Sequence, residues 1–422
     1  MSSQRKSIPD SPVPQVRTRR VFYIPGYDPI HPRRYRELYR KEGAAQAAIS
    51  GYELKLNARK GTVIGRYGWS VTGNMDGTEV AAEVDVLVWS DIVRSSMSHT
   101  ILATYLQLIR TAWTYIASGA LFRLMRLRKG PVIAALYPVG FLLVQLFLAI
   151  AVGYALFCGV LALWGVVSLP GAVAQLFGAG LGIAAGYVLL RWFKARDGKF
   201  YAYYLMHDYA YAARHGGANP PALEARMAEF ADEIAHALTG VSDEVLIVGH
   251  SSGAHLAVSI LADLIRAGRV CDDGPALSFL SLGQVVPMVS FLPGAHRLRA
   301  DLAYLSQSGA LTWVDVTAPG DGCAFALCDP VSVSGVAPLR KRWPLVISAA
   351  FSQTLSPARW RELRWKFFRL HFQYLCAFDR PGDYDYFRIT AGPMTLSQRY
   401  AGRAPSASRI ERAVNKYTSI AA

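Results

Sequence analysis

Ionisable residues are absent from one long part of the chain. Between Gly130 and Leu190 there is no Asp, Glu, Lys, Arg or His, over a run of 61 residues. One helix that crosses a bilayer needs about 20 apolar residues, so this run has room for two. The segment Ser168-Leu169-Pro170-Gly171 divides it, because Pro-Gly terminates helices. The sequence therefore predicts a transmembrane hairpin over residues 130–192, with a pair of very apolar core helices as the alternative.

Two other features are missing. The first twenty residues are polar and basic and lack the apolar stretch of a signal peptide, so we expect a disordered basic tail over residues 1–19. The cysteines have no metal-ligand spacing, and an odd number in a cytoplasmic setting favours reduced thiols. The sequence accordingly predicts neither a metal site nor a cofactor. The five cysteines are Cys158, Cys271, Cys323, Cys328 and Cys376.

Positive charge is in excess, with a net charge of +15. Basic residues flank the uncharged run on both sides, which by the positive-inside rule places both flanks in the cytoplasm. We expect a multi-pass protein of a bacterial inner membrane with its remaining domain in the cytoplasm. The predicted partner of this charge is an anionic lipid leaflet rather than a nucleic acid. The flanking residues are Arg123, Arg126, Arg128, Lys129, Arg191, Lys194, Arg196 and Lys199.

Outside the hairpin, strand-like segments alternate with helix-like segments. This alternation predicts an α/β fold, a mostly parallel sheet with helices on both faces, into which the hairpin is inserted. The predicted strands are 20–24, 52–57, 62–72, 84–89, 245–247, 276–282, 311–316 and 344–351. The predicted organisation is a tail over 1–19, a first part of the α/β domain over 20–99, a helix over 100–129, the hairpin over 130–192, a second part over 193–400 and a C-terminal tail over 401–422.

Two further helical segments are predicted. Residues 100–127 are apolar, and Arg110 is their only charge before Arg123. Their aromatic residues favour a helix at the membrane interface, with a core helix and a third span as alternatives. Residues 291–308 are a candidate for a helix that caps the site described next, and the sequence does not identify the lid.

A sharp strand-to-helix turn is predicted at Gly249-His250-Ser251-Ser252-Gly253. An apolar strand precedes it and a helix-forming stretch follows it. A serine at such a turn is held in a strained position, and small flanking residues let strand and helix approach closely. Gly249 and Gly253 supply that room. The pattern points to Ser251 as a nucleophile in acyl transfer.

Acyl transfer at a serine also needs a base and an acid that orients the base. In the α/β-hydrolases, whose nucleophile turn this motif resembles, the order along the chain is serine, acid, histidine. Of the histidines after Ser251, only His371 also follows the best acid candidates, so this order implies His371 as the base. Asp321 follows the strand predicted over 311–316 and is the preferred acid. Asp329 is the second choice.

Together these motifs resemble an α/β-hydrolase, and they are similar to uncharacterised bacterial, membrane-anchored members of that superfamily. The resemblance covers most of residues 20–390 apart from the hairpin. It implies a serine nucleophile, a histidine base and an aspartate that orients the base, with an oxyanion hole made by two backbone N–H groups. The residues that match are Ser251, His371 and Asp321 for the triad, Ser252 and Tyr27 for the oxyanion hole, and Gly26, Gly249 and Gly253 as motif glycines. The loop Pro25-Gly26-Tyr27-Asp28-Pro29 departs from the His-Gly-Gly-Gly motif.

The sequence thus predicts a membrane-anchored serine hydrolase that cleaves an ester or thioester, with a lipid-like substrate favoured by the membrane location. Acyl transfer to an acceptor other than water uses the same residues. The alternative class is a catalytically silent hydrolase fold that serves as a membrane scaffold or lipid-binding protein, because a fold does not determine a function. A transporter is disfavoured, since the two spans carry no ionisable residue. No oligomeric state is predicted.

Overall fold

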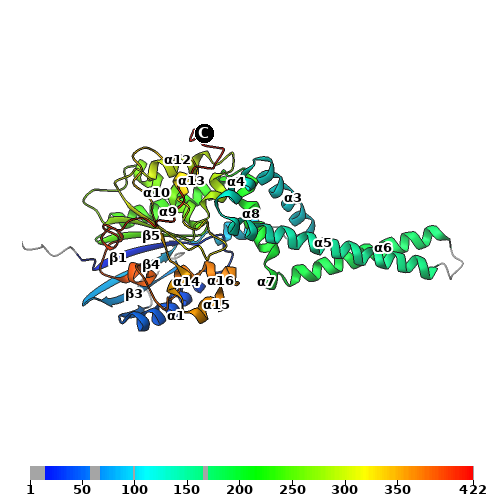
Figure 1. The fold of residues 1–422 in the computed structure, drawn as a ribbon, viewed down its shortest axis with the longest axis horizontal. Coiled ribbons are helices and arrows are strands. Elements are labelled where there is room, and N and C mark those ends of the chain that lie inside the picture. Colours follow the sequence, from blue (N-terminus) through cyan, green and yellow to red (C-terminus); the bar gives the residue numbers. More distant parts are fainter. Residues whose placement is uncertain (1–14, 58–66, 98–99, 165–169, 422) are drawn as a thin grey trace, which may run out of the picture.

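An eight-stranded sheet forms the centre of the molecule (Figure 1). The computed structural model describes residues 15–57, 67–97, 100–164 and 170–421. The strand order is β2-β3-β4-β1-β5-β6-β7-β8, with parallel pairs from β4 to β8 and antiparallel pairs from β2 to β4. The strands are β1 Thr18–Ile24, β2 Glu53–Asn57, β3 Tyr67–Met75, β4 Thr78–Val86, β5 Glu244–His250, β6 Ala276–Leu282, β7 Thr312–Thr317 and β8 Leu345–Ser348. The predicted, mostly parallel sheet is confirmed; residues 62–66 of one predicted strand lie outside the described residues.

Most of the remaining chain is helical. The helices before the hairpin and within it are α1 Arg33–Ser50, α2 Ser90–Ser96, α3 Ile101–Ala117, α4 Ala120–Leu127, α5 Lys129–Trp164 and α6 Gly171–Ala195. Those from the hairpin to β7 are α7 Asp197–Phe200, α8 Ala202–Arg214, α9 Pro221–Leu238, α10 Gly253–Arg266, α11 Val286–Ser290 and α12 His296–Leu305. The last are α13 Pro330–Val333, α14 Phe351–Thr354, α15 Pro357–Leu363, α16 Phe367–His371, the 3-10 helix Gln373–Leu375, α17 Tyr386–Ala391 and α18 Leu396–Arg399.

Helices cover both faces of the sheet. Figure 1 shows α9, α10 and α12 on one side, and α1 with α14 to α16 on the other. The buried strand β5 serves both layers, because successive side chains of a strand point to opposite faces. Val245 and Ile247 join the core that contains α9 and α10, whereas Leu246 and Val248 join the core that contains α1. The predicted α/β architecture with helices on both faces is therefore present.

Helix α12 lies in the layer beside α10. Its residues Leu298, Leu302 and Leu305 are buried in the core shared with α9 and α10. Their spacing places the three leucines on one face of the helix, toward the sheet. The prediction that residues 291–308 cap the site is therefore wrong.

The ends of the described chain both belong to the body. β1 begins at Thr18, so the predicted tail over 1–19 includes the start of the sheet, while residues 1–14 lie outside the described residues. The predicted C-terminal tail runs along the body without a helix after residue 401. Ser406 N–H donates to the Val346 carbonyl at 2.9 Å and joins this segment to β8.

Helices α5 and α6 extend from one end of the body as an antiparallel pair (Figure 1). They contain 36 and 25 residues, so their lengths are about 54 Å and about 38 Å at 1.5 Å per residue. Both are long and apolar enough to cross a membrane. Their apolar side chains face outward, as with Phe147 (69% exposed) and Leu176 (77% exposed). The hairpin predicted over 130–192 is present as a helix pair, and the alternative of a buried core pair is wrong.

Small residues on α6 bring the two helices together. Ala174, Gly178, Gly182 and Gly186 recur every four residues and are the buried positions of α6. This spacing places them on one face, where small side chains permit close approach of two helices. A Cβ on Gly182 would lie 2.5 Å from the carbonyl oxygen of Gly153 on α5. The helices therefore pack backbone against backbone at this point.

Gly182→Val is expected to disrupt the hairpin, because its side chain meets the α5 backbone and overpacking costs about 1–3 kcal/mol or more. The measurement is thermal unfolding of the purified protein in dodecylmaltoside, followed by tryptophan fluorescence. Gly180→Val is the matched control, since a Cβ at Gly180 meets no atom within 4 Å. Equal melting temperatures for the two variants would contradict this packing.

Helix α3 connects the root of the hairpin to the body. The Tyr105 hydroxyl donates to the Leu142 carbonyl of α5, and the Tyr115 hydroxyl donates to the Met288 carbonyl of α11, both at 2.9 Å. The opposite face of α3 is apolar and exposed, whereas α4 buries Ala120, Leu124 and Leu127 in the body. Residues 100–127 are therefore partly buried, and the core-helix alternative is met in part. At 17 residues α3 is not one of the two described helices that are long and apolar enough to span a membrane. The exposed row is Leu102, Leu106, Ile109, Trp113 and Ile116.

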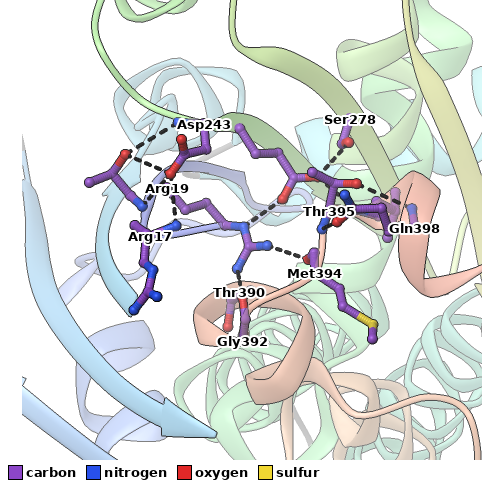
Figure 2. A network of polar contacts seen from close by, with 12 residues as sticks. Arg17, Arg19, Asp243, Ser278, Thr390, Gly392, Met394, Thr395 and Gln398 are labelled. Carbon is purple, nitrogen blue, oxygen red and sulfur yellow. Dashed lines mark hydrogen bonds and ion pairs between the residues drawn. The ribbon is translucent and has the colours of Figure 1, made fainter. Parts of the chain in front are cut away.

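A buried ion pair joins the start of β1 to the start of β5 (Figure 2). Arg19 Nε donates to Glu244 Oε2 at 2.6 Å, and the guanidinium also donates to the carbonyls of Gly392 and Met394 at 2.8 and 2.5 Å. Glu244 Oε1 accepts from the Leu396 N–H at 2.7 Å. Because every one of these bonds is buried or partly buried, the network attaches the C-terminal segment to the middle of the sheet.

Arg19→Met is expected to destabilise the protein strongly, because it leaves the Glu244 carboxylate buried without its partner. Breaking a buried pair in this way costs about 3–5 kcal/mol. Thermal unfolding in dodecylmaltoside measures the loss. Arg17→Met is the control, since that side chain is exposed, and a similar loss in both variants would contradict the role assigned to the ion pair.

Candidate active site

Ser251 occupies a left-handed turn between β5 and α10. Its φ is +56°, a conformation that costs a non-glycine residue of the order of 1 kcal/mol or more. The Ser251 N–H donates to the carbonyl of Leu282, the last residue of β6, at 2.9 Å. The predicted strand-turn-helix at this serine is present, and the turn is held by the neighbouring strand.

The three motif glycines make this turn possible. A Cβ on Gly253 would lie 2.1 Å from the Ile24 carbonyl oxygen, so the start of α10 lies directly against the end of β1. A Cβ on Gly249 would lie 2.8 Å from Ala254 Cα, and one on Gly26 would lie 3.0 Å from Ser251 Cβ. No larger residue fits at Gly253 without moving the backbone.

His371 and Asp321 lie together, as predicted. His371 ends α16, and its Nδ1 lies 2.8 Å from Asp321 Oδ2 in the loop after β7. Asp321 Oδ1 also accepts from the Cys323 N–H at 2.8 Å, and Oδ2 accepts from the Tyr374 hydroxyl at 3.0 Å. Burial would raise the pKa of Asp321, but the charge of His371 and these hydrogen bonds outweigh burial and hold the pKa below its usual range. The carboxyl is therefore ionised and fixed in position.

Tyr374 is a member of this group that the sequence reasoning missed. Its hydroxyl accepts from the Ala318 N–H at 3.0 Å while it donates to Asp321. The sequence could have indicated Tyr374 by its position three residues after His371, because residues three apart in a helix lie on the same side.

Asp329, the second choice for the acid, has a different role. Its carboxylate caps α13 by accepting from the N–H groups of Val331 and Ser332 at 2.9 and 3.0 Å, and it forms an ion pair with Lys341. These partners engage both of its oxygens away from His371. The geometry therefore favours Asp321.

Ser251 and His371 line one cavity of about 940 Å³. A Cβ on Gly283, the residue after Leu282, would lie 3.1 Å from His371 Cε1, so the histidine sits beside the strand end that holds the serine. Because Asp321 engages Nδ1, Nε2 is the ring nitrogen left for a serine. Among the described residues no hydrogen bond joins Ser251 Oγ to His371, and such contacts often form only when substrate binds.

The proposed oxyanion donors line the same cavity. The N–H groups of Ser252 and Tyr27 donate none of the backbone hydrogen bonds found among the described residues. The Tyr27 side chain is anchored by a hydrogen bond of 2.6 Å between its hydroxyl and Ser96 Oγ. Two unengaged donors near the serine match what a developing oxyanion requires.

Helix α8 forms one wall of the cavity and was not connected to the site by the sequence reasoning. It contributes Tyr204, Leu205 and Asp208. Burial raises the pKa of Asp208 to about 7. No hydrogen bond or ion pair to Asp208 is found within the described ranges. The helical spacing of these residues marks one face of α8, but only the fold shows what that face meets.

The hairpin root contacts the loop that carries the acid. A Cβ on Gly130, at the start of α5, would lie 3.4 Å from Gly322 Cα. The Arg128 guanidinium donates to the Ala326 carbonyl at 2.8 Å. The apolar helix pair and the candidate site are therefore adjacent.

Three possible metal ligands meet at this loop. Atoms of Asp321, Cys323 and His371 lie within 4.8 Å of one another. Both Asp321 oxygens already accept hydrogen bonds, and burial raises the pKa of the Cys323 thiol above its usual range. A metal prefers the thiolate and a free carboxylate. The cluster therefore fits a hydrogen-bonded acid and base better than a metal site.

Comparisons with known protein families, with curated proteins and with solved structures find no match to this chain.

Asp208→Asn is expected to stabilise the protein at alkaline pH. The pKa of Asp208 is about 7 in the folded chain and about 3.9 when unfolded, so folding is opposed increasingly as the pH rises from about 4 to 7. The amide has no charge to bury, so the melting temperature should rise by roughly 2 °C or more at pH 8 and by less at pH 5. Asp273→Asn, at an exposed position, is the control; a gain that is larger at pH 5 would contradict the argument.

Proposed function

We propose that the chain is a membrane-anchored serine hydrolase of the α/β-hydrolase type that cleaves an ester or thioester. The observation that carries this proposal is the left-handed Ser251 beside the bonded pair Asp321 and His371, all at one edge of a parallel sheet. Structural serines have no need of a strained turn, whereas nucleophiles are commonly presented by one.

The residues supply each step of acyl transfer. Ser251 Oγ attacks the acyl carbon while His371 Nε2 takes the hydroxyl proton, and Asp321 stabilises the resulting imidazolium. The N–H groups of Ser252 and Tyr27 bind the oxyanion. Collapse of the tetrahedral intermediate expels the alcohol or thiol, which takes the proton from His371. Water then attacks the acyl-enzyme with the same base, releases the carboxylic acid and restores the serine.

The membrane is the proposed location, with the body in the cytoplasm. Helices α5 and α6 are long and apolar enough to cross it, and basic residues lie on both flanks of the pair. The cavity wall includes Pro131 of α5 and Tyr115 of α3, so it reaches the root of the hairpin. This continuity favours a lipid-like acyl substrate that enters from the cytoplasmic leaflet.

A fluorescent fluorophosphonate probe tests the proposal on the full chain in dodecylmaltoside. Wild type should be labelled and Ser251→Ala should not, while His371→Ala should be labelled more slowly by about 100-fold or more, because it lacks the general base. Ser95→Ala and His236→Ala are controls at exposed positions.

Failure of folded wild-type protein to react would sink the enzyme proposal and favour the alternative of a catalytically silent membrane scaffold. Labelling that persists in Ser251→Ala would assign the reactive group elsewhere.

A further inference from the structure

Asp208 is the acidic residue of the cavity wall that has no partner in the described part of the chain. The other wall acids are engaged: Asp28 pairs with Arg34, and Glu42 pairs with Arg359. Glu37 and Glu362 also pair with basic side chains, and Asp197 accepts from two N–H groups of α8. Burying a carboxylate without a partner is costly, and a bound ligand that brings a positive charge would offset this cost.

Aromatic residues share the cavity wall with this carboxyl. Tyr27, Tyr115, Tyr204 and Tyr209 line the cavity together with Asp208, and the ring centroids of Tyr27 and Tyr204 lie 6.3 Å apart. The hydroxyls of Tyr27, Tyr115 and Tyr204 are bonded to Ser96 and to the carbonyls of Met288 and Tyr27 respectively. These three hydroxyls are therefore bonded elsewhere and do not satisfy Asp208.

Rings and carboxylate together select for positive charge. The faces of aromatic rings are electronegative and attract ammonium groups, and a carboxylate adds direct ionic attraction. The same surroundings repel an anion. Asp208 lines the same cavity as His371 and Ser251, so a cation bound there would share the cavity with the proposed reacting centre.

We infer that Asp208 and the tyrosine rings of the cavity wall form a subsite for an ammonium group of the substrate. The inference rests on the proposed function, and it narrows the substrate class to esters or thioesters that carry a cationic amine. Such an ammonium group could belong either to the ester of a free amino alcohol or to the amine head-group of a lipid.

Competition against fluorophosphonate labelling of Ser251 tests the subsite in wild type, Asp208→Asn, Asp208→Glu and the control Asp273→Asn. Choline is the cationic competitor, and 3,3-dimethylbutan-1-ol is its neutral isostere. Dihexanoylphosphatidylcholine and dihexanoylphosphatidylglycerol form the lipid pair. The full chain is used in dodecylmaltoside, a detergent without an ammonium group.

Choline should slow labelling of wild type and of Asp273→Asn. In Asp208→Asn the concentration needed should rise by about tenfold or more, while the effect of the neutral alcohol stays the same. Asp208→Glu should retain a preference for the cation. A structural role for Asp208 would change both competitors equally and would overturn the inference, as would equal protection of wild type by choline and its isostere.

Comparison of dihexanoylphosphatidylcholine with dihexanoylphosphatidylglycerol distinguishes a lipid head-group from a free amino alcohol as the source of the ammonium group. Protection by the phosphatidylcholine that requires Asp208 supports a lipid head-group, and protection by choline alone supports a free amino alcohol. If wild type is not labelled at all, the proposed function has failed, and the subsite is tested by the rise in melting temperature with choline. A rise in wild type that is absent in Asp208→Asn still supports the subsite, and no rise in either overturns it.

Discussion

The close approach of α10 to the end of β1 is the constraint on which the candidate site depends. Only a glycine at position 253 allows this approach, since a Cβ there would lie 2.1 Å from the Ile24 carbonyl oxygen. Ser251 is thereby held in its left-handed turn, with its N–H bonded to the end of β6. The other parts follow from the parallel arrangement of the strands. Tyr27 comes after β1 and Asp321 after β7, and the carboxyl ends of parallel strands lie on the same side of the sheet.

The sequence predicted the features that depend on the local pattern of residues along the chain. The uncharged run marks α5 and α6, the alternation of strands and helices marks the α/β class, and the small residues around Ser251 mark the turn. The pairing of Asp321 with His371 was predicted from the residue order of α/β-hydrolases and from the position of Asp321 after a predicted strand, although fifty residues separate the two.

The rest depends on tertiary packing. Tyr374 lies in a short 3-10 helix and Asp208 lies in α8. Only the fold shows that both residues reach the site. The same holds for α12, whose leucines could have covered a cavity or a sheet, and which covers the sheet. For α3 the sequence is mostly apolar, and only the packing shows which of its faces stays exposed.

In the chain, the hairpin lies between β4 and β5, the two strands that flank β1 in the sheet. β4 and β5 pair with opposite edges of β1, yet α5 and α6 separate them in the chain. In the proposed location, the β5 side of β1 stays unpaired during synthesis, because β5 is made only after both apolar helices have left the ribosome. Unpaired strand edges invite aggregation. Insertion of the helices into the bilayer would therefore precede closure of the sheet, which makes the membrane part of the folding route and not only an anchor.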